Sequence, residues 1–295
     1  MADDLAHPEM EPALPVAMDN VSPDPHPAAD ALFLHVHQIL IAQPFDRPLA
    51  LAPIIDDNVD RLRHLYPESS YRLWTHDDLR DFLAQSFPRE VCQAFDRLRP
   101  YAYKADLGRL CLLHAMGGLY SDISFFWMER LRPPPMAAIA SFLDVRSSSP
   151  AWTALSNGLI WARPGRQEMA IAIDMILANC RNHYYGLNSL HPTGPVLLGR
   201  AFVKALAQQD SDEGWSEQWV GHARFLTPMG YPKGLACFTP DGKMVAISRK
   251  EGGTGLGDLQ LPGGNNYNDF WNGRTVYGED CPDALEPCQE AVAAP

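Results

Sequence analysis

The stretch that decides the fold is residues 100–126, PYAYKADLGRLCLLHAMGGLYSDISFF. Its first part, residues 100–116, is mostly apolar and predicts a helix that starts with a proline in its first turn. The pair Gly117-Gly118 ends this helix. Residues 119–127 are largely apolar and aromatic and predict a strand.

Three charged residues of this stretch are expected at one place. Asp106 and Arg109 are three positions apart on the predicted helix, so they share one face. Asp122 lies just after the start of the predicted strand, at the carboxyl edge of a parallel sheet, where open α/β folds bind ligands. A carboxylate there suits Mg²⁺ or Mn²⁺, because these hard cations bridge protein oxygens to a diphosphate. The cation withdraws charge from a leaving diphosphate.

Strand and helix signals alternate on both sides of this stretch. Thr75-x-x-Asp78 has the pattern of a helix capping box, and Asp241-Gly242 has that of a tight hairpin turn. The predicted strands are 32–41, 71–74, 119–127, 139–145 and 158–162, with a hairpin at 237–247. The predicted helices are 59–66, 75–86, 88–99, 100–116 and 168–182, with another after Gly194-Pro195. This order predicts an α/β fold with a mainly parallel central sheet flanked by helices, a C-terminal hairpin and a lid.

The composition indicates one domain between two irregular ends. Residues 1–30 are rich in Pro, Ala, Asp and Glu without periodicity and are predicted to be a disordered leader. Residues 31–278 are long enough for a single domain, and 46% of the whole chain is hydrophobic, which provides a substantial core. Residues 279–295 have little apolar content and are predicted to be a flexible tail.

Charge and cysteine usage exclude several classes of function. The chain has 24 basic and 36 acidic residues, a net charge of −12, which argues against nucleic-acid partners and against a polybasic membrane patch. Its six cysteines form no CxxC pair or disulfide framework, and Cys92, Cys111 and Cys180 have the spacing of core residues. We expect no transmembrane segment and a cytoplasmic location, with peripheral membrane contact left open.

Residues 102–124 resemble the DXD-containing sugar-binding region of glycosyltransferase family 32. This family is related to fungal α-mannosyltransferases, α-1,4-galactosyltransferases and, more distantly, clostridial glucosylating toxins. The family pattern Ala-x-x-Ser-Asp-x-x-Arg, apolar helix, Gly-Gly-x-Tyr-x-Asp-x-Asp is matched by AYKADLGR at 102–109 and GGLYSDIS at 117–124. Weaker matches at 37–39, 71–74, 157–165 and 193–195 extend the resemblance over roughly residues 32–278.

The resemblance implies a GT-A-like fold and a retaining glycosyltransferase. Its donor would be a UDP- or GDP-sugar, its cofactor Mn²⁺ or Mg²⁺, and its acceptor a glycan or lipid-linked glycan in cell-surface polysaccharide or lipopolysaccharide synthesis. The predicted catalytic residues are Asp122, Arg109 and Asn157, with Asp106 on sugar or ribose hydroxyls and Arg109 on the diphosphate. The resemblance also assigns nucleotide-sugar binding to Tyr120, Gly117, Gly118 and Trp271.

The sequence departs from the family pattern at three places. Leu40 stands where relatives have a tryptophan that stacks on the base, and Ser124 replaces the second aspartate of the motif. A serine hydroxyl ligates a cation without supplying a charge. The usual C-terminal His-His-x-x-x-Ser-Trp ending is replaced by GGNNYNDFW at 263–271. The predicted metal ligands are therefore Asp122 and Ser124, with Asn268 or Asp269 within one water's reach of Asp122.

Each of the central site residues has a structural alternative. Asp122 on its own is also typical of a turn after a strand, and Asp106 with Arg109 is also typical of an exposed helix ion pair. Tyr120 suits core packing, and Asn157 suits a turn.

Other polar residues are interpreted mainly as structural. His35 and His37 alternate with apolar residues and indicate core histidines, and Lys104 is expected in solvent. The glycines of 251–257 lack the context of a dinucleotide loop and favour a lid over the sugar site. Residues 265–269 are equally typical of a helix N-cap.

Two other functions remain open on the sequence alone. One is a glycosyltransferase that modifies a protein side chain, as the toxin relatives do. The other is a non-catalytic sugar- or nucleotide-binding protein that kept the fold after losing the second aspartate.

Overall fold

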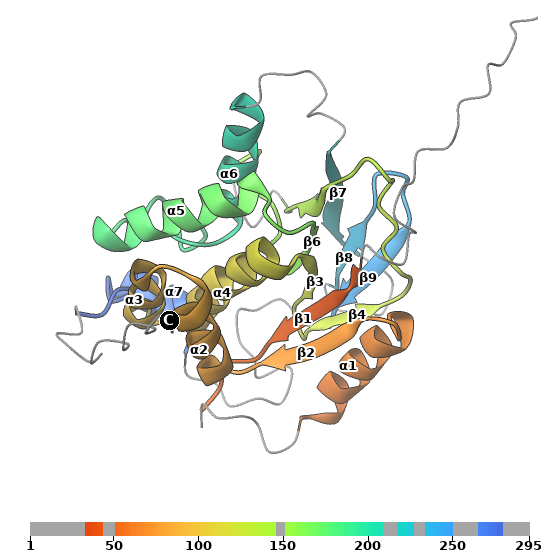
Figure 1. The fold of residues 1–295 in the computed structure, drawn as a ribbon, viewed down its shortest axis with the longest axis horizontal. Coiled ribbons are helices and arrows are strands. Elements are labelled where there is room, and N and C mark those ends of the chain that lie inside the picture. The colour runs from red at the N-terminus through yellow and green to blue at the C-terminus, as the bar shows by residue number, and fades with distance from the viewer. Residues whose placement is uncertain are drawn as a thin grey trace, which may run out of the picture.

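The computed structural model describes residues 33–43, 51–145, 151–208, 217–226, 234–249 and 265–279. In these ranges seven helices flank one nine-stranded sheet (Figure 1). The helices are α1 (Pro53–Leu65), α2 (His76–Ser86), α3 (Arg89–Arg97), α4 (Tyr101–Met116), α5 (Gln167–Arg181), α6 (Pro195–Ala207) and α7 (Tyr267–Asn272). The strands are β1 (His35–Ile39), β2 (Ser70–Trp74), β3 (Gly118–Ser121), β4 (Phe125–Trp127), β5 (Ile139–Leu143), β6 (Leu159–Ala162), β7 (Gln218–Phe225), β8 (Leu235–Phe238) and β9 (Met244–Ser248).

The predicted α/β fold, with helices around a central sheet and a C-terminal hairpin, is confirmed. The capping box at Thr75 and Asp78 is present at the start of α2, and β8 and β9 form the hairpin. The predicted leader at 1–30, the tail beyond Glu279 and the lid at 251–257 lie outside the described residues. None of the helices that the structure describes is long and apolar enough to cross a membrane.

The sheet is mixed rather than mainly parallel. Its order is β2-β1-β3-β6-β5-β7-β8-β9-β4, and only β1–β2, β1–β3 and β5–β7 pair in parallel. Parallel neighbours need a crossover connection, usually a helix. The four strands β3 to β6 follow one another along the chain with no helix among the described residues that connect them, and β6 pairs antiparallel with both β3 and β5.

The predicted strand at 119–127 is divided by a turn at residues 122–124. Its first part is β3, third in the sheet order, and its second part is β4, at the far edge beside β9. Three residues span at most about 10 Å, so the sheet curls and brings its last strand back towards β3. Helix α1 contacts β4 and lies beside it in Figure 1. The motif aspartate therefore lies in a tight turn and not inside a strand.

Helices cover the two faces of the sheet unequally. Tyr120 and Ile160 pack in the large core formed with α2 to α6. Leu119 and Trp161, their neighbours on the same strands, pack on the opposite face with Leu62 of α1. Strands alternate their side chains between faces, so β3 joins both layers.

Two consecutive glycines allow β3 to begin close to its neighbours. Gly117 has φ +65° and Gly118 has φ +96°, in the region that favours glycine. A Cβ on Gly118 would lie 2.3 Å from the backbone oxygen of His35, and one on Gly117 would lie 2.7 Å from the Pro164 ring. The glycine break is therefore required by backbone contact as well as by helix termination.

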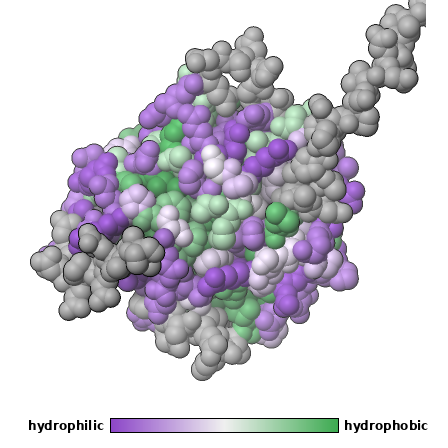
Figure 2. All heavy atoms as spheres, in the orientation of Figure 1, coloured by the Kyte–Doolittle hydropathy of each residue, from purple (hydrophilic) through white to green (hydrophobic). Residues whose placement is uncertain are grey.

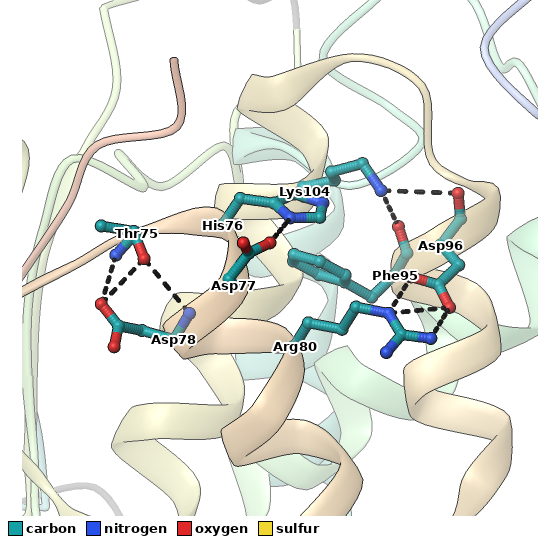
Figure 3. Close-up of polar contacts among 8 residues, drawn as sticks. All are labelled: Thr75, His76, Asp77, Asp78, Arg80, Phe95, Asp96 and Lys104. Carbon is teal, nitrogen blue, oxygen red and sulfur yellow. Dashed lines mark hydrogen bonds and ion pairs between the residues drawn. The ribbon is translucent and has the colours of Figure 1, made fainter. Parts of the chain in front are cut away.

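The expectation that Lys104 lies in solvent is wrong. Its side chain is buried, and Nζ donates to the backbone oxygens of Phe95 and Asp96 at the end of α3 (Figure 3). The last carbonyls of a helix have no partner within the helix, so a lysine from the next helix satisfies them. The ammonium also lies 4.5 Å from the centre of the Phe95 ring, a cation–π contact. Arg80 of α2 pairs with the Asp96 carboxylate beside it.

The buried Lys104 makes stability depend on pH in a defined direction. Burial lowers the pKa of Lys104 from 10.5 to about 8. The unfolded chain therefore holds more protons than the folded one between these values, and the wild type gains stability as pH rises through that window. We expect urea unfolding to show that the free energy of unfolding of the wild type rises, relative to that of Lys104→Met, between about pH 8 and about pH 10. The exposed Lys243→Met is the control, and an equal pH trend in both variants would contradict the assignment.

Candidate active site

The site is organised around one buried arginine. Arg109 of α4 has a 6% exposed side chain, and its two terminal nitrogens each lie 3.3 Å from a carboxylate oxygen, one of Asp106 and one of Asp122. Its Nε donates to the Ala105 backbone oxygen and Nη1 to that of Asn157, at 3.1 and 2.6 Å. Asp106 and Arg109 are therefore a buried pair and not an exposed helix ion pair.

Tyr120 holds both the arginine and the motif aspartate. Its hydroxyl donates to Asp122 Oδ1 at 2.7 Å, and its ring lies 4.5 Å from the Arg109 guanidinium carbon. Burial raises the pKa of Tyr120 well above its usual value, so the phenol stays a proton donor. Tyr120 is packed in the core, as its structural alternative predicted, and its binding of a nucleotide-sugar stays a prediction.

Asp106 is enclosed by protein donors. It accepts hydrogen bonds from Asn157 Nδ2 at 3.0 Å and from Thr193 Oγ1 at 2.6 Å. Burial raises the pKa of Asp106, and the neighbouring Arg109 charge opposes that rise. The arginine resists deprotonation: burial disfavours its charge, but Tyr120, Asp122 and Asp106 outweigh burial and raise its pKa.

Asn157 joins the helix to the loop before β6. Its backbone oxygen accepts from Arg109 and its amide nitrogen donates to Asp106. Its Oδ1 is buried without a hydrogen-bond partner in the described part of the chain. A buried acceptor without a donor is costly, by about 1–3 kcal/mol, so Oδ1 is suited to accept from a ligand hydroxyl.

Two site residues were not among the predicted ones. Thr193 reaches Asp106 from the loop before α6; its Thr-Gly-Pro match was the signal, but nothing in the sequence indicated its partner. Gly158 lies against the motif aspartate: a Cβ there would be 3.0 Å from Asp122 Oδ2 and 2.7 Å from the Phe125 ring. A side chain at 158 would thus displace the carboxylate.

The turn after β3 exposes one carboxylate and buries one serine. The Asp122 side chain is 30% exposed, in contrast to the buried Asp106. Ser124 is buried, and its backbone oxygen accepts from the Arg249 amide at 2.8 Å. No group of three or more His, Cys, Asp or Glu within the described ranges could hold a metal ion. Carboxylate and hydroxyl oxygens are both ligand types that hard cations accept, so Asp122 and Ser124 have the chemistry for such a site.

The C-terminal segment is attached near the first turns of α4. Asn268 Oδ1 accepts from Ser189 Oγ at 2.6 Å, and the Tyr103 hydroxyl of α4 donates to the Ser189 backbone oxygen. Asn266 caps α7 through its side chain, as the alternative interpretation of this segment predicted.

Asp269 and Trp271 of the same segment have different surroundings from Asn268. Asp269 is exposed, and Trp271 Nε1 donates to the Tyr185 backbone oxygen at 2.8 Å. The closeness of Asn268 or Asp269 to Asp122, and the contact of Trp271 with phosphate or sugar, stay predictions.

A partly exposed carboxylate, held by a buried arginine at the carboxyl end of a strand, is typical of ligand sites in α/β folds. Residues 55–141, from α1 to β5, match the family model described as glycosyltransferase sugar-binding region containing DXD motif. This match includes Asp106, Arg109 and Asp122, and it confirms the resemblance stated from the sequence.

Several known proteins are similar to parts of this chain. An uncharacterized glycosyltransferase of Acanthamoeba polyphaga mimivirus is 30% identical over 91 residues, which are 31% of this chain and 36% of that protein. Inositol phosphoceramide mannosyltransferase 3 of Schizosaccharomyces pombe is 26% identical over 157 residues, 53% of this chain and 42% of that protein. A solved structure, PaToxG glycosyltransferase, has a TM-score of 0.44 at 16% identity and covers 63% of this chain and 74% of that one. The chain thus matches less than half the length of these two curated relatives.

Removal of the central guanidinium should destabilise the protein far more than removal of a surface one. Arg109→Met leaves the Asp106 carboxylate buried without its ion pair, and we expect the free energy of unfolding to fall by about 3–5 kcal/mol. Arg80→Met, which breaks the half-exposed pair with Asp96, should cost less than about 1 kcal/mol. Urea denaturation of both variants measures the difference, and equal losses would contradict the central role of Arg109.

Proposed function

We propose that the protein is a glycosyltransferase that moves a sugar, with retention of configuration, from a UDP- or GDP-sugar to a glycan or lipid-linked glycan acceptor. The observation that carries the proposal is Asp122, held partly exposed after β3 by Tyr120 and Arg109, inside a segment that matches a glycosyltransferase sugar-binding region. A divalent cation and a diphosphate both suit this position.

In this proposal the turn residues hold the cation. The Asp122 carboxylate would be the charged ligand of Mn²⁺ or Mg²⁺, and the Ser124 hydroxyl would be a neutral one. When bound, the cation stabilises the negative charge that develops on the leaving diphosphate. Tyr120 and Arg109 fix Asp122 Oδ1 from two directions, so the carboxylate keeps one orientation before the donor arrives.

The buried residues are assigned a positioning role. Asp106 accepts hydrogen bonds from Asn157 and Thr193 and is ion-paired with Arg109. Arg109 in turn donates to two backbone oxygens. These contacts favour a role for Asp106 and Arg109 in positioning Asp122. The sequence had predicted direct contacts of these two residues with the sugar and the diphosphate. Asn157 Oδ1 has no hydrogen-bond partner among the described residues and is assigned to a hydroxyl of the donor sugar. Both carboxylates are paired with Arg109, so neither is assigned as a nucleophile, and we favour same-face displacement.

The acceptor class rests on similarity alone. The name of the Schizosaccharomyces pombe relative describes mannosyl transfer to inositol phosphoceramide, which fits a lipid-linked acceptor better than a protein side chain. A role in cell-surface polysaccharide or lipopolysaccharide synthesis, and the cytoplasmic location, stay predictions.

A non-catalytic binding protein is the second candidate, and Ser124 is the observation that favours it. The turn has one carboxylate where the family pattern has two, so the site has less negative charge with which to bind a cation. Purified protein incubated with a panel of UDP- and GDP-sugars and Mn²⁺ separates the two. Metal-dependent hydrolysis or transfer supports the enzyme, and binding without turnover supports the second candidate.

Asp122→Asn tests the charged ligand. The amide keeps the shape and the contact with Tyr120 but removes the charge, so we expect turnover to fall at least about 100-fold, or about 2.7 kcal/mol of transition-state stabilisation. The folded state should persist, as measured by circular dichroism. Asp77→Asn, an exposed carboxylate on α2, is the matched control. Turnover within about tenfold of wild type would rule out Asp122 as the principal ligand.

Ser124→Asp tests the neutral ligand. A second buried carboxylate should destabilise the metal-free protein, because its charge is then close to that of Asp122. Bound Mn²⁺ compensates that charge, so the rise in melting temperature on Mn²⁺ addition should be larger than in wild type. An equal or smaller rise in the variant would show that residue 124 does not face the cation.

A further inference from the structure

Helix α1 contacts the motif turn through one buried amide. Asn58 lies in the middle of α1 and is fully buried, and its Nδ2 donates to the backbone oxygen of Ile123 at 2.8 Å. Ile123 is the residue between Asp122 and Ser124. A side chain from the opposite layer of the fold, far away in the sequence, therefore reaches the centre of the proposed cation-binding turn.

The orientation of this amide is determined by its partner. A backbone carbonyl only accepts, so the nitrogen of Asn58 must face Ile123 and the oxygen must face away. That oxygen, Oδ1, is buried without a hydrogen-bond partner among the described residues. Ile55 and Val59, on the same helix, and Ile123, whose carbonyl accepts from Asn58, belong with Leu40 to one buried apolar cluster.

If residue 58 served only to pack the core, an amide would therefore be less favourable than an apolar side chain. An unsatisfied buried acceptor costs about 1–3 kcal/mol, whereas a leucine of similar size would suit this apolar cluster. Among the described residues, the one hydrogen bond of the Asn58 side chain is to the turn, so the turn is where this side chain has an effect.

Each backbone carbonyl of the turn accepts a hydrogen bond, but the donors come from different parts of the fold. The Asp122 oxygen accepts from the Phe125 amide and from Ser121 Oγ, and the Ser124 oxygen accepts from the Arg249 amide. These donors belong to the turn, to the strand before it and to the strand beside it. Asn58 is the side-chain donor to the peptide between them, which sets the relative positions of Asp122 and Ser124.

We propose that Asn58 is a positioning residue for the cation-binding turn. By holding the Ile123 carbonyl it fixes the peptide plane between Asp122 and Ser124, and so the distance between their ligand oxygens. This inference rests on the proposed function, since it assigns Asn58 to the geometry of that same site.

The same helix supplies a matched control. Arg61 of α1 donates from Nε to the Trp127 oxygen and from Nη2 to the Met128 oxygen, each at 3.0 Å. These are also side-chain contacts from α1 to backbone carbonyls, but they lie beyond the turn at the end of β4. Arg61→Met removes two such bonds and leaves the turn itself unchanged.

The experiment compares Asn58→Leu, Asn58→Ala and Arg61→Met. Leucine fills the site and alanine leaves a cavity, so the two Asn58 variants should differ in stability. Both should lower kcat by about 10- to 100-fold, because both lose the same contact to the turn, while donor KM changes little. Arg61→Met should keep kcat within about twofold of wild type even where it lowers stability. If the loss of kcat is proportional to the loss of stability across all three variants, the proposal is overturned.

A second measurement does not depend on the reaction. The Phe125 amide donates to Asp122 across the turn, so its hydrogen exchange reports the order of the turn. Exchange at Phe125 should be faster in Asn58→Leu and unchanged in Arg61→Met, and equal exchange in wild type and Asn58→Leu would overturn the proposal. If wild type transfers no sugar but exchange follows this pattern, the proposed function fails while the bracing contact is supported.

Discussion

The arrangement of the site depends on one guanidinium group that is buried between two carboxylates. A charge taken out of water costs several kcal/mol unless it is paired and hydrogen-bonded, and Arg109 satisfies this condition with Asp106, Asp122 and two backbone oxygens. Its partners come from α4, from the turn after β3 and from the loop before β6. The glycines that end α4 let β3 turn back beside the helix, which makes these distances attainable. The fold and the site therefore share one constraint.

Most elements could be predicted because their signals are local. Capping at Thr75, the Gly117-Gly118 break and the turn at Asp241-Gly242 each specify backbone geometry within a few residues, and all three occur as expected. Strand direction is different, because it depends on which strands meet and on what connects them. The mixed sheet, and the division of one predicted strand into β3 and β4, follow from long-range pairing that no local pattern reveals.

The site was predictable where spacing along one helix or strand determines it. Asp106, Arg109, Tyr120 and Asp122 meet because each lies on α4 or at β3, two adjacent elements. Their partners from other layers were not predictable: the contact of Thr193 with Asp106 is a tertiary one. Lys104 was misjudged for the same reason, since the helix end that buries it belongs to α3.

The charges of the site indicate why a serine is tolerable at position 124. With both carboxylates ionised, Asp106 and Asp122 carry two negative charges and Arg109 one positive charge, which leaves one net negative charge. Under the proposed function, a divalent cation would reverse that sign, and the cluster would then complement the diphosphate of a nucleotide-sugar. A second aspartate would raise cation affinity without any donor. With Ser124 in its place, the diphosphate would supply the missing negative charge, so cation and donor would reinforce each other's binding. In that proposal, part of the cation site belongs to the substrate and not to the protein.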